Sequence, residues 1–293
     1  MTDTSSDQRL IEPAPIRTLH LGRVTVSYIP DGFTPLNARK WFPGTTDEFW
    51  AEHAEYLNDD EDLIAPVRSL LVQSEGRAML IDAGFGRPFG LREFPTPFGT
   101  LQGGAMFDSL AKLDVEASDI EVVALTHLDG DHVGGLWQLA PGASRLPFAN
   151  ATVVVSADEW ARPDLAEERG TLPLILDAFA SQVSAVGDGD EIFPGVRVVA
   201  LPGHSIGHVG YVISSGGRRL IAFGDAMHSP IQIGHPDLAA VVDYDPAQST
   251  ETRRWLINEL ARPDTLGFGG HFPNSPFGRV KIRSGAAFWD PQL

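Results

Sequence analysis

The chain has 293 residues, 43% of them hydrophobic and 21% charged, which is ordinary for a globular protein that buries a sizeable core. Its formal net charge of −17 repels polyanions, and no run rich in Lys or Arg offsets that charge, so nucleic acid is excluded as a partner. No apolar run approaches the length needed to cross a membrane and the N-terminus is polar, so we expect a cytoplasmic protein that has no membrane partner.

The N-terminal region predicts an arm followed by a strand. Residues 1–15 are polar and end in Glu-Pro-Ala-Pro, which is typical of a flexible arm. No shift in composition divides residues 16–293, so a single domain is expected there. Alternating apolar residues over 18–29 predict a strand, and Pro30-Asp31-Gly32 predicts the turn that closes it.

Two loop excursions flank a predicted hairpin. The first, 38–66, is rich in Trp and Phe and predicts a short helix with loops, and the second, 85–107, is rich in Gly, Pro and Phe and predicts a long loop. Such segments either cover the core or line a pocket, and long loops are often functional, so we expect both to lie over the active site. Between them, the apolar runs 67–72 and 78–81 predict a hairpin that delivers Asp82 to a glycine-containing turn.

The rest of the chain alternates between strand and helix patterns. Apolar spacing predicts a short helix around 106–113 and a fully apolar strand at 122–125. Further strands are predicted at 152–155, 196–201, 209–213, 220–223 and 265–268, and helices at 172–183 and 247–261. The mixture of hairpins and crossovers predicts an α/β fold in which helices cover the sheets.

A dense group of metal-competent side chains follows the strand at 122–125. His127, Asp129, Asp131 and His132 fall within six residues, and Gly134-Gly135 allows a close approach of the helix expected to begin at His132. The chain has no cysteine, so any metal must be held by imidazole and carboxylate groups. Taken alone, the run has an alternative interpretation as an acid-rich capping turn, but its density favours a metal site.

Three more such side chains stand where an apolar strand meets a glycine-rich turn. They are His204 in Pro-Gly-His-Ser-Ile-Gly-His, Asp225 after Gly224, and His271 after Gly269-Gly270. A histidine at a strand end is often only structural, so none of the three would predict a site alone. Together with the run at 127–132, they predict one shared centre.

This ordered set resembles the metallo-β-lactamase-fold hydrolase superfamily over about 18–282. The segments 224–232 and 271–280 are similar to its methyl parathion hydrolase and quorum-quenching lactonase-like branch. The resemblance implies an αββα four-layer sandwich with a metal centre at one edge of the two sheets.

The resemblance also implies two divalent metal ions and a role for each residue of the set. One ion would take His127, Asp129 and His204, the other Asp131, His132 and His271, and Asp225 would bridge both. Asp82 would orient ligands from behind them, and His208 would hold the loop that carries His204.

Asp129 is the one departure from the family pattern. It stands where the usual run, His-x-His-x-Asp-His, has its second histidine. Zinc is the expected metal, but a carboxylate at this position would better tolerate manganese or iron. Alternatively, Asp129 does not ligate and the first site is only partly occupied. The substitution also resembles flavodiiron proteins, but the chain has no room for their flavodoxin-like domain, so di-iron oxygen chemistry is the more distant alternative.

The function implied is hydrolysis of a lactone or other carboxylic ester by a hydroxide that bridges two ions. Phosphotriester and β-lactam hydrolysis are alternatives on the same centre, and a non-catalytic scaffold is a further one. Asp131 is a candidate for orienting the hydroxide or carrying a proton. His228 is a candidate for donating a hydrogen bond to the oxyanion or protonating the leaving group, or else it only lines the pocket. We expect a partly apolar small-molecule substrate, while a homodimer remains an open alternative.

Overall fold

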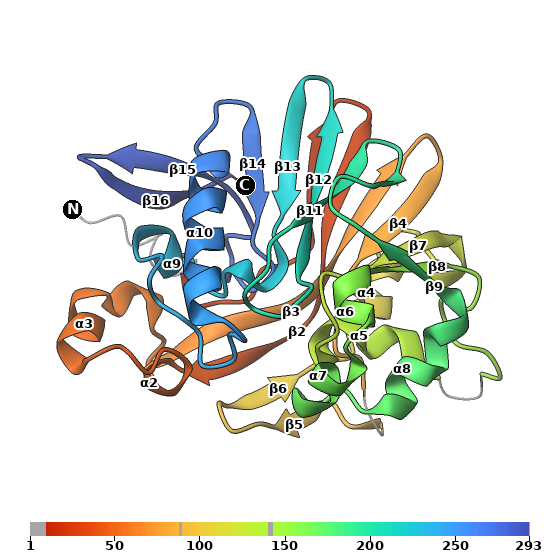
Figure 1. Ribbon diagram of the computed structural model, residues 1–293, viewed down its shortest axis with the longest axis horizontal. Helices are drawn as coiled ribbons and strands as arrows, with labels where there is room; N and C mark the ends of the chain where they lie inside the picture. Colours follow the sequence, from red (N-terminus) through yellow and green to blue (C-terminus); the bar gives the residue numbers. More distant parts are fainter. Residues whose placement is uncertain (1–9, 88–89, 140–142, 293) are drawn as a thin grey trace.

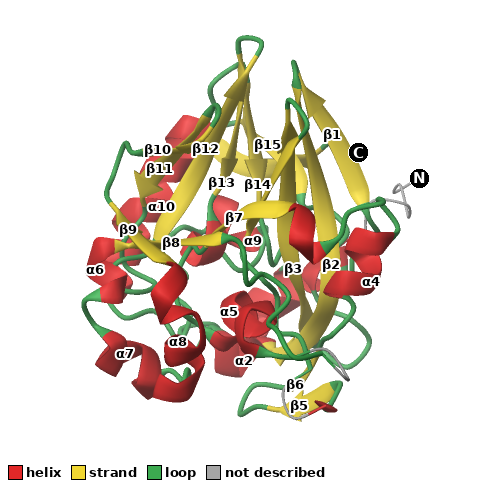
Figure 2. Ribbon diagram, turned by 90° about the vertical axis from the view of Figure 1, so that its right-hand side faces the viewer, coloured by secondary structure: helices red, strands yellow, loops and turns green. Residues whose placement is uncertain are grey.

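Two sheets lie face to face and carry helices on their outer faces. The computed structural model describes residues 10–87, 90–139 and 143–292, so positions 1–9 of the predicted arm and 88–89 of the second excursion lie outside the described residues. Figure 1 and Figure 2 show the two sheets and the helices that flank them. Within the described residues no helix is both long enough and apolar enough to cross a membrane.

The first sheet has nine strands within the described ranges. In spatial order they are β5 (Glu93–Pro95), β6 (Thr100–Gln102), β2 (Val24–Asn37), β3 (Asp62–Ser74), β4 (Arg77–Ile81), β7 (Ile120–Ala124), β8 (Thr152–Ser156) and β9 (Val183–Val186), with β1 (Arg17–Leu21) paired to β2. Strands β4, β7, β8 and β9 are parallel neighbours. Parallel strands place their carboxyl ends at one edge, where a site can be assembled.

The second sheet has seven strands in the part of the chain that the structure describes. Their order is β10 (Glu191–Phe193), β11 (Val196–Ala200), β12 (Val209–Ser215), β13 (Arg218–Ala222), β14 (Thr265–Phe268), β15 (Phe277–Arg283) and β16 (Ala286–Pro291). Only β13 and β14 pair in parallel among these strands, and the connection between them contains two α-helices.

Apolar side chains from both sheets form the core between them. Val26 and Leu70 of the first sheet pack in one buried cluster with Ile213 and Phe268 of the second. Outside the first sheet lie α4 (Met106–Ala111), α5 (Gly130–Trp137), α6 (Ala157–Trp160), α7 (Pro163–Glu168) and α8 (Pro173–Phe179), and outside the second lie α9 (Ile231–Gly234) and α10 (Pro246–Leu260). The predicted αββα layering is confirmed.

The entry into the sheet differs from the prediction. The chain forms two strands, β1 and β2, in place of one at 18–29, and they are joined at Gly22, whose φ of 57° suits glycine. The predicted turn at Pro30-Asp31-Gly32 is also wrong, because β2 continues through it. A shift in the β2–β3 register between Pro30 and Gly32 accommodates the proline within the sheet.

The two excursions contain more regular structure than expected. The first holds α2 (Ala38–Trp41) and α3 (Asp47–Glu52), and it ends early because β3 begins at Asp62. The second holds the short hairpin β5–β6, which the absence of periodicity had suggested would be a loop. Strands of three residues are too short to show alternation, so pattern alone does not predict them.

Most later elements agree with the prediction to within a few residues. The helix predicted at 172–183 is α8 followed by a 3-10 turn, and α5 begins at Gly130 rather than at His132. The hairpin β15–β16 was not predicted. None of these differences moves a candidate ligand away from a strand end.

Asp31 anchors both ends of the second excursion. Its buried carboxylate accepts backbone N–H bonds of 2.8–2.9 Å from Phe85 and Gly86 at one end and from Gly104 and Met106 at the other. Carboxylate bonds of this kind each contribute about 1.5–3 kcal/mol. The side chain therefore fixes the base of a segment whose tip is the β5–β6 hairpin.

We expect Asp31→Ala to lower the free energy of unfolding by more than about 3 kcal/mol, because four backbone N–H groups, two of them buried and two part-buried, lose their acceptor. Urea denaturation would measure this loss, and hydrogen exchange would show faster opening at 85–86 and 104–106. Asp177→Ala, on the exposed face of α8, is the control and should change neither reading. Unaltered exchange at both ends of the excursion in Asp31→Ala would contradict the anchoring role.

Candidate metal centre

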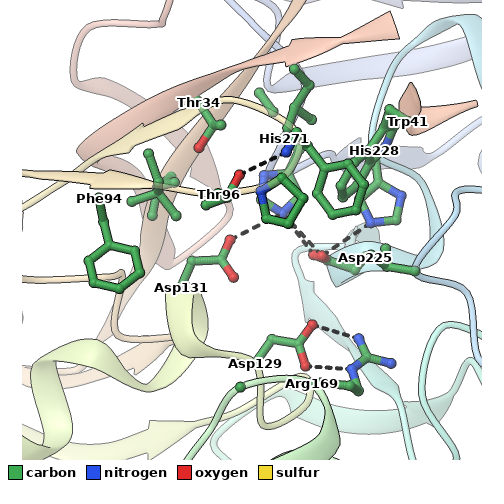
Figure 3. Close-up of a pocket in the computed structure, with 18 of the residues that line it drawn as sticks. Thr34, Trp41, Phe94, Thr96, Asp129, Asp131, Arg169, Asp225, His228 and His271 are labelled. Carbon is green, nitrogen blue, oxygen red and sulfur yellow. Dashed lines mark hydrogen bonds and ion pairs between the residues drawn. The ribbon is translucent and has the colours of Figure 1, made fainter. Parts of the chain in front are cut away.

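Six of the candidate ligands converge where strands of both sheets end. His127 follows β7, Asp131 and His132 lie in the first turn of α5, and His204, Asp225 and His271 follow β11, β13 and β14. Figure 3 shows Asp131, Asp225, His228 and His271 facing a common space, with Asp129 below them. Several groups of residues have ligand atoms that lie within 4.8 Å of one another. They include His127–Asp129–His204, which we call the first half-site, and Asp131–His132–His271, which we call the second.

The second half-site is formed by Asp131, His132 and His271 around Asp225. The Nδ1 atom of His132 lies 2.9 Å from Oδ2 of Asp82, and Nδ1 of His271 lies 2.7 Å from the carbonyl oxygen of Pro66. Each Nδ1–H therefore donates to its oxygen partner, which turns the Nε2 lone pair inward. This is how metal-binding histidines are usually oriented.

The inward atoms of this half-site suit a cation. Nε2 of His132 and Nε2 of His271 lie 3.3 and 3.1 Å from Oδ1 of Asp225, and each lies 3.7 Å from Oδ2 of Asp131. Buried Nε2 of His132 and Oδ1 of Asp225 have no hydrogen-bond partner among the described residues. Unsatisfied buried lone pairs that face one another are costly unless a cation lies between them, so these residues fit a metal ion.

The electrostatics of the second half-site lead to the same conclusion. Burial alone would lower the pKa of His132, but the carboxylates of Asp225 and Asp82 raise it well above its ordinary value. Burial alone would raise the pKa of Asp225, but His271 and His132 hold it well below its ordinary range. The carboxylates around the His132 ring thus favour positive charge at this position, as expected where a divalent cation binds.

Asp82 lies directly behind His132, one of these candidate ligands. It adopts a φ of 58°, and its carboxylate accepts bonds from the Thr126 backbone N–H at 2.8 Å and from His132. Arg68, fully buried, lies 3.4 Å from the same carboxylate. Burial alone would raise the pKa of Asp82, but His132 and then Arg68 lower it to about 2. The group is therefore a permanent anion that orients His132.

The first half-site contains a cation that the sequence did not indicate. Asp129 forms a bidentate ion pair with Arg169, with Nε to Oδ1 at 2.7 Å and Nη2 to Oδ2 at 2.5 Å (Figure 3). Nη2 of Arg169 also lies 2.6 Å from Nε2 of His204. Burial would raise the pKa of Asp129, but Arg169 and then His127 hold it well below its usual range.

His208 holds the backbone of the centre rather than facing its interior. Its Nδ1 lies 2.9 Å from the carbonyl oxygen of Leu201, and its Nε2 accepts the Asp225 backbone N–H at 3.0 Å. Burial, with His127 nearby, keeps its pKa well below the ordinary value, so the ring is neutral and can accept that bond. It ties the loop of His204 to the loop of Asp225.

His228 is buried beside the cluster, at the wall of the pocket. Its Nε2 lies 3.3 Å from Oδ2 of Asp225, and its ring stacks on His271 and meets the edge of Trp41. Burial lowers its pKa to about 4, although Asp225 acts in the opposite direction. A neutral imidazole there carries one N–H donor and one lone pair.

A pocket of about 400 Å³ opens directly onto these groups. Its floor contains Asp129, Asp131, Asp225 and His271, and most of its wall is apolar. The wall residues come from the β2–β3 region, α2 and the β5–β6 hairpin, and include Leu36, Trp41, Ala65, Val67, Phe94, Pro97, Phe98 and Leu101. Metal-competent groups therefore lie at the base of an apolar cavity.

Sequence reasoning missed several charged residues that support the site. Glu159 accepts bonds from Ser205 and Gly207 and so holds the loop of His204, and Asp243 lies 3.3 Å from Nδ1 of His204. Arg68 and Arg169 were also missed. None of them belongs to a local motif, and only the fold brings them to the centre.

Comparisons with known proteins agree with this architecture. The family model described as Metallo-beta-lactamase superfamily matches residues 64–271. The "Probable metallo-hydrolase Rv2300c" of Mycobacterium tuberculosis is 28% identical over 177 residues, which are 54% of this chain and 56% of that protein, so the match spans little more than half of the relative.

Two solved structures share the fold over nearly their whole length. "AidC, a Dizinc Quorum-Quenching Lactonase" superposes with a TM-score of 0.81 at 23% identity, covering 96% of this chain and 99% of that one. The hydrolase AbOPH "in beta lactamase superfamily" gives a TM-score of 0.80 at 23% identity, with the same coverage. With the family match over most of the chain and the metal-competent cluster at the sheet edge, the protein belongs to the metallo-beta-lactamase superfamily.

Proposed function

We propose that the protein is a metal-dependent hydrolase that cleaves a lactone or another carboxylic ester with a partly apolar acyl group. The observation that carries the proposal is the position of the second half-site at the base of an apolar pocket. The relatives named as a metallo-hydrolase and as a lactonase support the same reaction class. Zinc is the first choice of metal, in line with the dizinc lactonase.

Asp131, His132, His271 and Asp225 would hold the ion. When bound, a divalent ion supplies a water of lowered pKa and a Lewis acid that polarises the bond to be cleaved. The sequence predicted two ions with a hydroxide between them, and such a centre needs both half-sites. The first half-site as arranged does not fit an ion, because Nη2 of Arg169 lies between Asp129 and His204.

Asp131 and His228 are the residues best placed to handle protons and charge. The Asp131 side chain is 23% exposed, reaches the pocket and lies 3.7 Å from both histidines, so it can orient the attacking water or take its proton. His228 also lines the pocket, and its neutral ring can donate one hydrogen bond to a developing oxyanion.

The pocket wall favours a substrate with an apolar part. Trp41, Phe94 and Phe98 present aromatic surface above the polar floor, and burying an apolar chain there gains about 25 cal/mol per Å² removed from water. An acyl or aryl group suits this wall better than a small anion does. The wall therefore supports a substrate with an apolar group, and the likeness to the lactonase AidC supports lactones and esters ahead of the phosphotriester and β-lactam alternatives.

Removal of metal is expected to abolish hydrolysis, and its return to restore it. The test uses protein treated with a chelator and then reconstituted separately with zinc, manganese or iron. Each form is assayed on lactones, aryl esters, phosphotriesters and β-lactams, and turnover should be fastest on a lactone or ester with an apolar chain. Activity that survives complete metal removal would overturn the proposal, while a preference for a phosphotriester or β-lactam would replace the substrate class.

A further inference from the structure

Arg169 reaches the metal centre from a part of the chain outside every metal-binding motif. It directly follows α7 and is 40 residues from Asp129 in the sequence. Its side chain is 18% exposed and its guanidinium lines the floor of the pocket. A long cationic side chain is thus held at the site instead of extending into solvent.

The guanidinium is bound in a fixed geometry. Nε and Nη2 pair with the two carboxylate oxygens of Asp129, and Nη1 donates to the backbone carbonyl of His204. Bidentate pairs of this kind are the strong, directional form of the arginine–carboxylate interaction. The contact to the backbone of His204 fixes the guanidinium relative to the loop that carries His204.

Nη2 of the Arg169 guanidinium lies where the candidate ligands of the first half-site meet. Nη2 is 2.5 Å from Oδ2 of Asp129 and 2.6 Å from Nε2 of His204. Since Nδ1 of His204 lies 3.3 Å from Asp243 and can donate to it, the Nε2 lone pair is the acceptor for Nη2. Of the three residues of the first half-site, Asp129 and His204 are therefore already bound to the guanidinium of Arg169.

Among the described residues, no arginine or lysine forms a hydrogen bond to the ligand atoms of the second half-site. Arg68 lies beside Asp225, but its Nη2 is 3.7 Å from Oδ1, which is beyond hydrogen-bond distance. Oδ1 of Asp225 and Nε2 of His132 remain without hydrogen-bond partners among the described residues. The two half-sites, alike in residue types, thus differ in whether a protein cation fills them.

We propose that Arg169 is the permanent cation of the first half-site and that the protein binds one metal ion, in the second half-site. Asp129, in place of the histidine of the family pattern, supplies the carboxylate that holds the guanidinium. A divalent ion could enter only by displacing it, against charge repulsion and the loss of a bidentate pair. This inference rests on the proposed function, which places a metal ion in the second half-site, and it sets the number of ions per chain at one.

The test counts metal ions independently of activity. Protein is saturated with zinc, freed of excess metal and analysed by elemental mass spectrometry, and a manganese-loaded sample is examined by electron paramagnetic resonance. We expect one zinc per chain and the signal of an isolated manganese ion. Two tightly bound zinc ions, or a spin-coupled manganese pair, would overturn the inference and leave the hydrolase proposal standing. Absence of any bound metal would overturn both.

Variants of Arg169 test its role directly. Arg169→Ala and the longer Arg169→Met remove the cation, and each is expected to bind two ions per chain and to show a spin-coupled manganese signal. Arg169→Lys keeps a positive charge and should stay at one ion. Arg162→Ala removes an exposed arginine at the other end of α7 and is the matched control, also at one ion. A single ion in both Arg169→Ala and Arg169→Met would contradict the assignment.

Discussion

Replacement of His132 by alanine is expected to lower kcat/KM for an ester substrate by more than about a thousandfold, because the metal-activated nucleophile is lost. His132 offers an unpaired Nε2 to the second half-site, and its other nitrogen is held by Asp82. Its removal would also leave the negative charge of Asp82 without the closer of its two ion-pair partners, since Arg68 lies farther away, at 3.4 Å. The same variant should therefore lose metal, which elemental analysis of the purified protein would measure.

Controls separate this effect from a general loss of structure. His20 is an exposed residue of β1 whose ring is hydrogen-bonded to Thr25, and it belongs to neither half-site. The His20→Ala variant should therefore keep full activity and its metal. Circular dichroism and thermal unfolding would establish that both variants are folded. A folded His132→Ala protein that retains full turnover would refute the assignment of the metal centre.

Gly134→Ala is expected to destabilise the protein by more than about 3 kcal/mol, at the upper end of what an overpacked core costs. A Cβ at this position would lie 2.0 Å from the carbonyl oxygen of Phe85, which is backbone and has little freedom to move. The contact is close because the Gly134 N–H donates to the Gly84 carbonyl at 2.8 Å, so α5 packs against the turn after β4.

Gly130, four residues earlier in the same helix, provides the matched control. An added Cβ there would meet no atom of the described residues within 4 Å, and alanine is favoured over glycine in helices by about 1 kcal/mol. Gly130→Ala should therefore leave the free energy of unfolding unchanged or slightly raised. Urea denaturation of the two variants beside the parent protein gives the comparison, and equal midpoints for all three would show that the close approach of α5 is not required.

The strand-end ligands could be predicted from sequence because their signal is local. His127, His204, Asp225 and His271 each stand beside glycine or just after an apolar run, His132 belongs to the dense run that begins at His127, and the fold brings these five together. The αββα layering was equally accessible, since long apolar strands and helices with one apolar face carry a strong pattern. Their metal-binding roles remain predictions that the experiments above address.

The features that escaped prediction depend on tertiary structure. Arg169 ends an acidic run, Glu167-Glu168-Arg169, that looks like an ordinary solvated helix face. Its pairing with Asp129 arises only when α7 is placed beside the loop after β7. The turn expected at Pro30-Asp31-Gly32 failed for a similar reason, because pairing with β3 outweighs the local preference of proline and glycine for a turn.

The second half-site draws its residues from two separate layers of the fold. His132 belongs to the helix that packs on the first sheet, Asp225 and His271 follow strands of the second, and His271 is held by the carbonyl oxygen of Pro66 in β3. An ion bound there would act as a cross-link between the layers, and its binding energy would add to the cohesion of the whole sandwich. At a free metal concentration one hundred times the Kd, this linkage amounts to about 2.7 kcal/mol. The concentration of free metal would then set the stability of the fold against unfolding as well as the rate of hydrolysis.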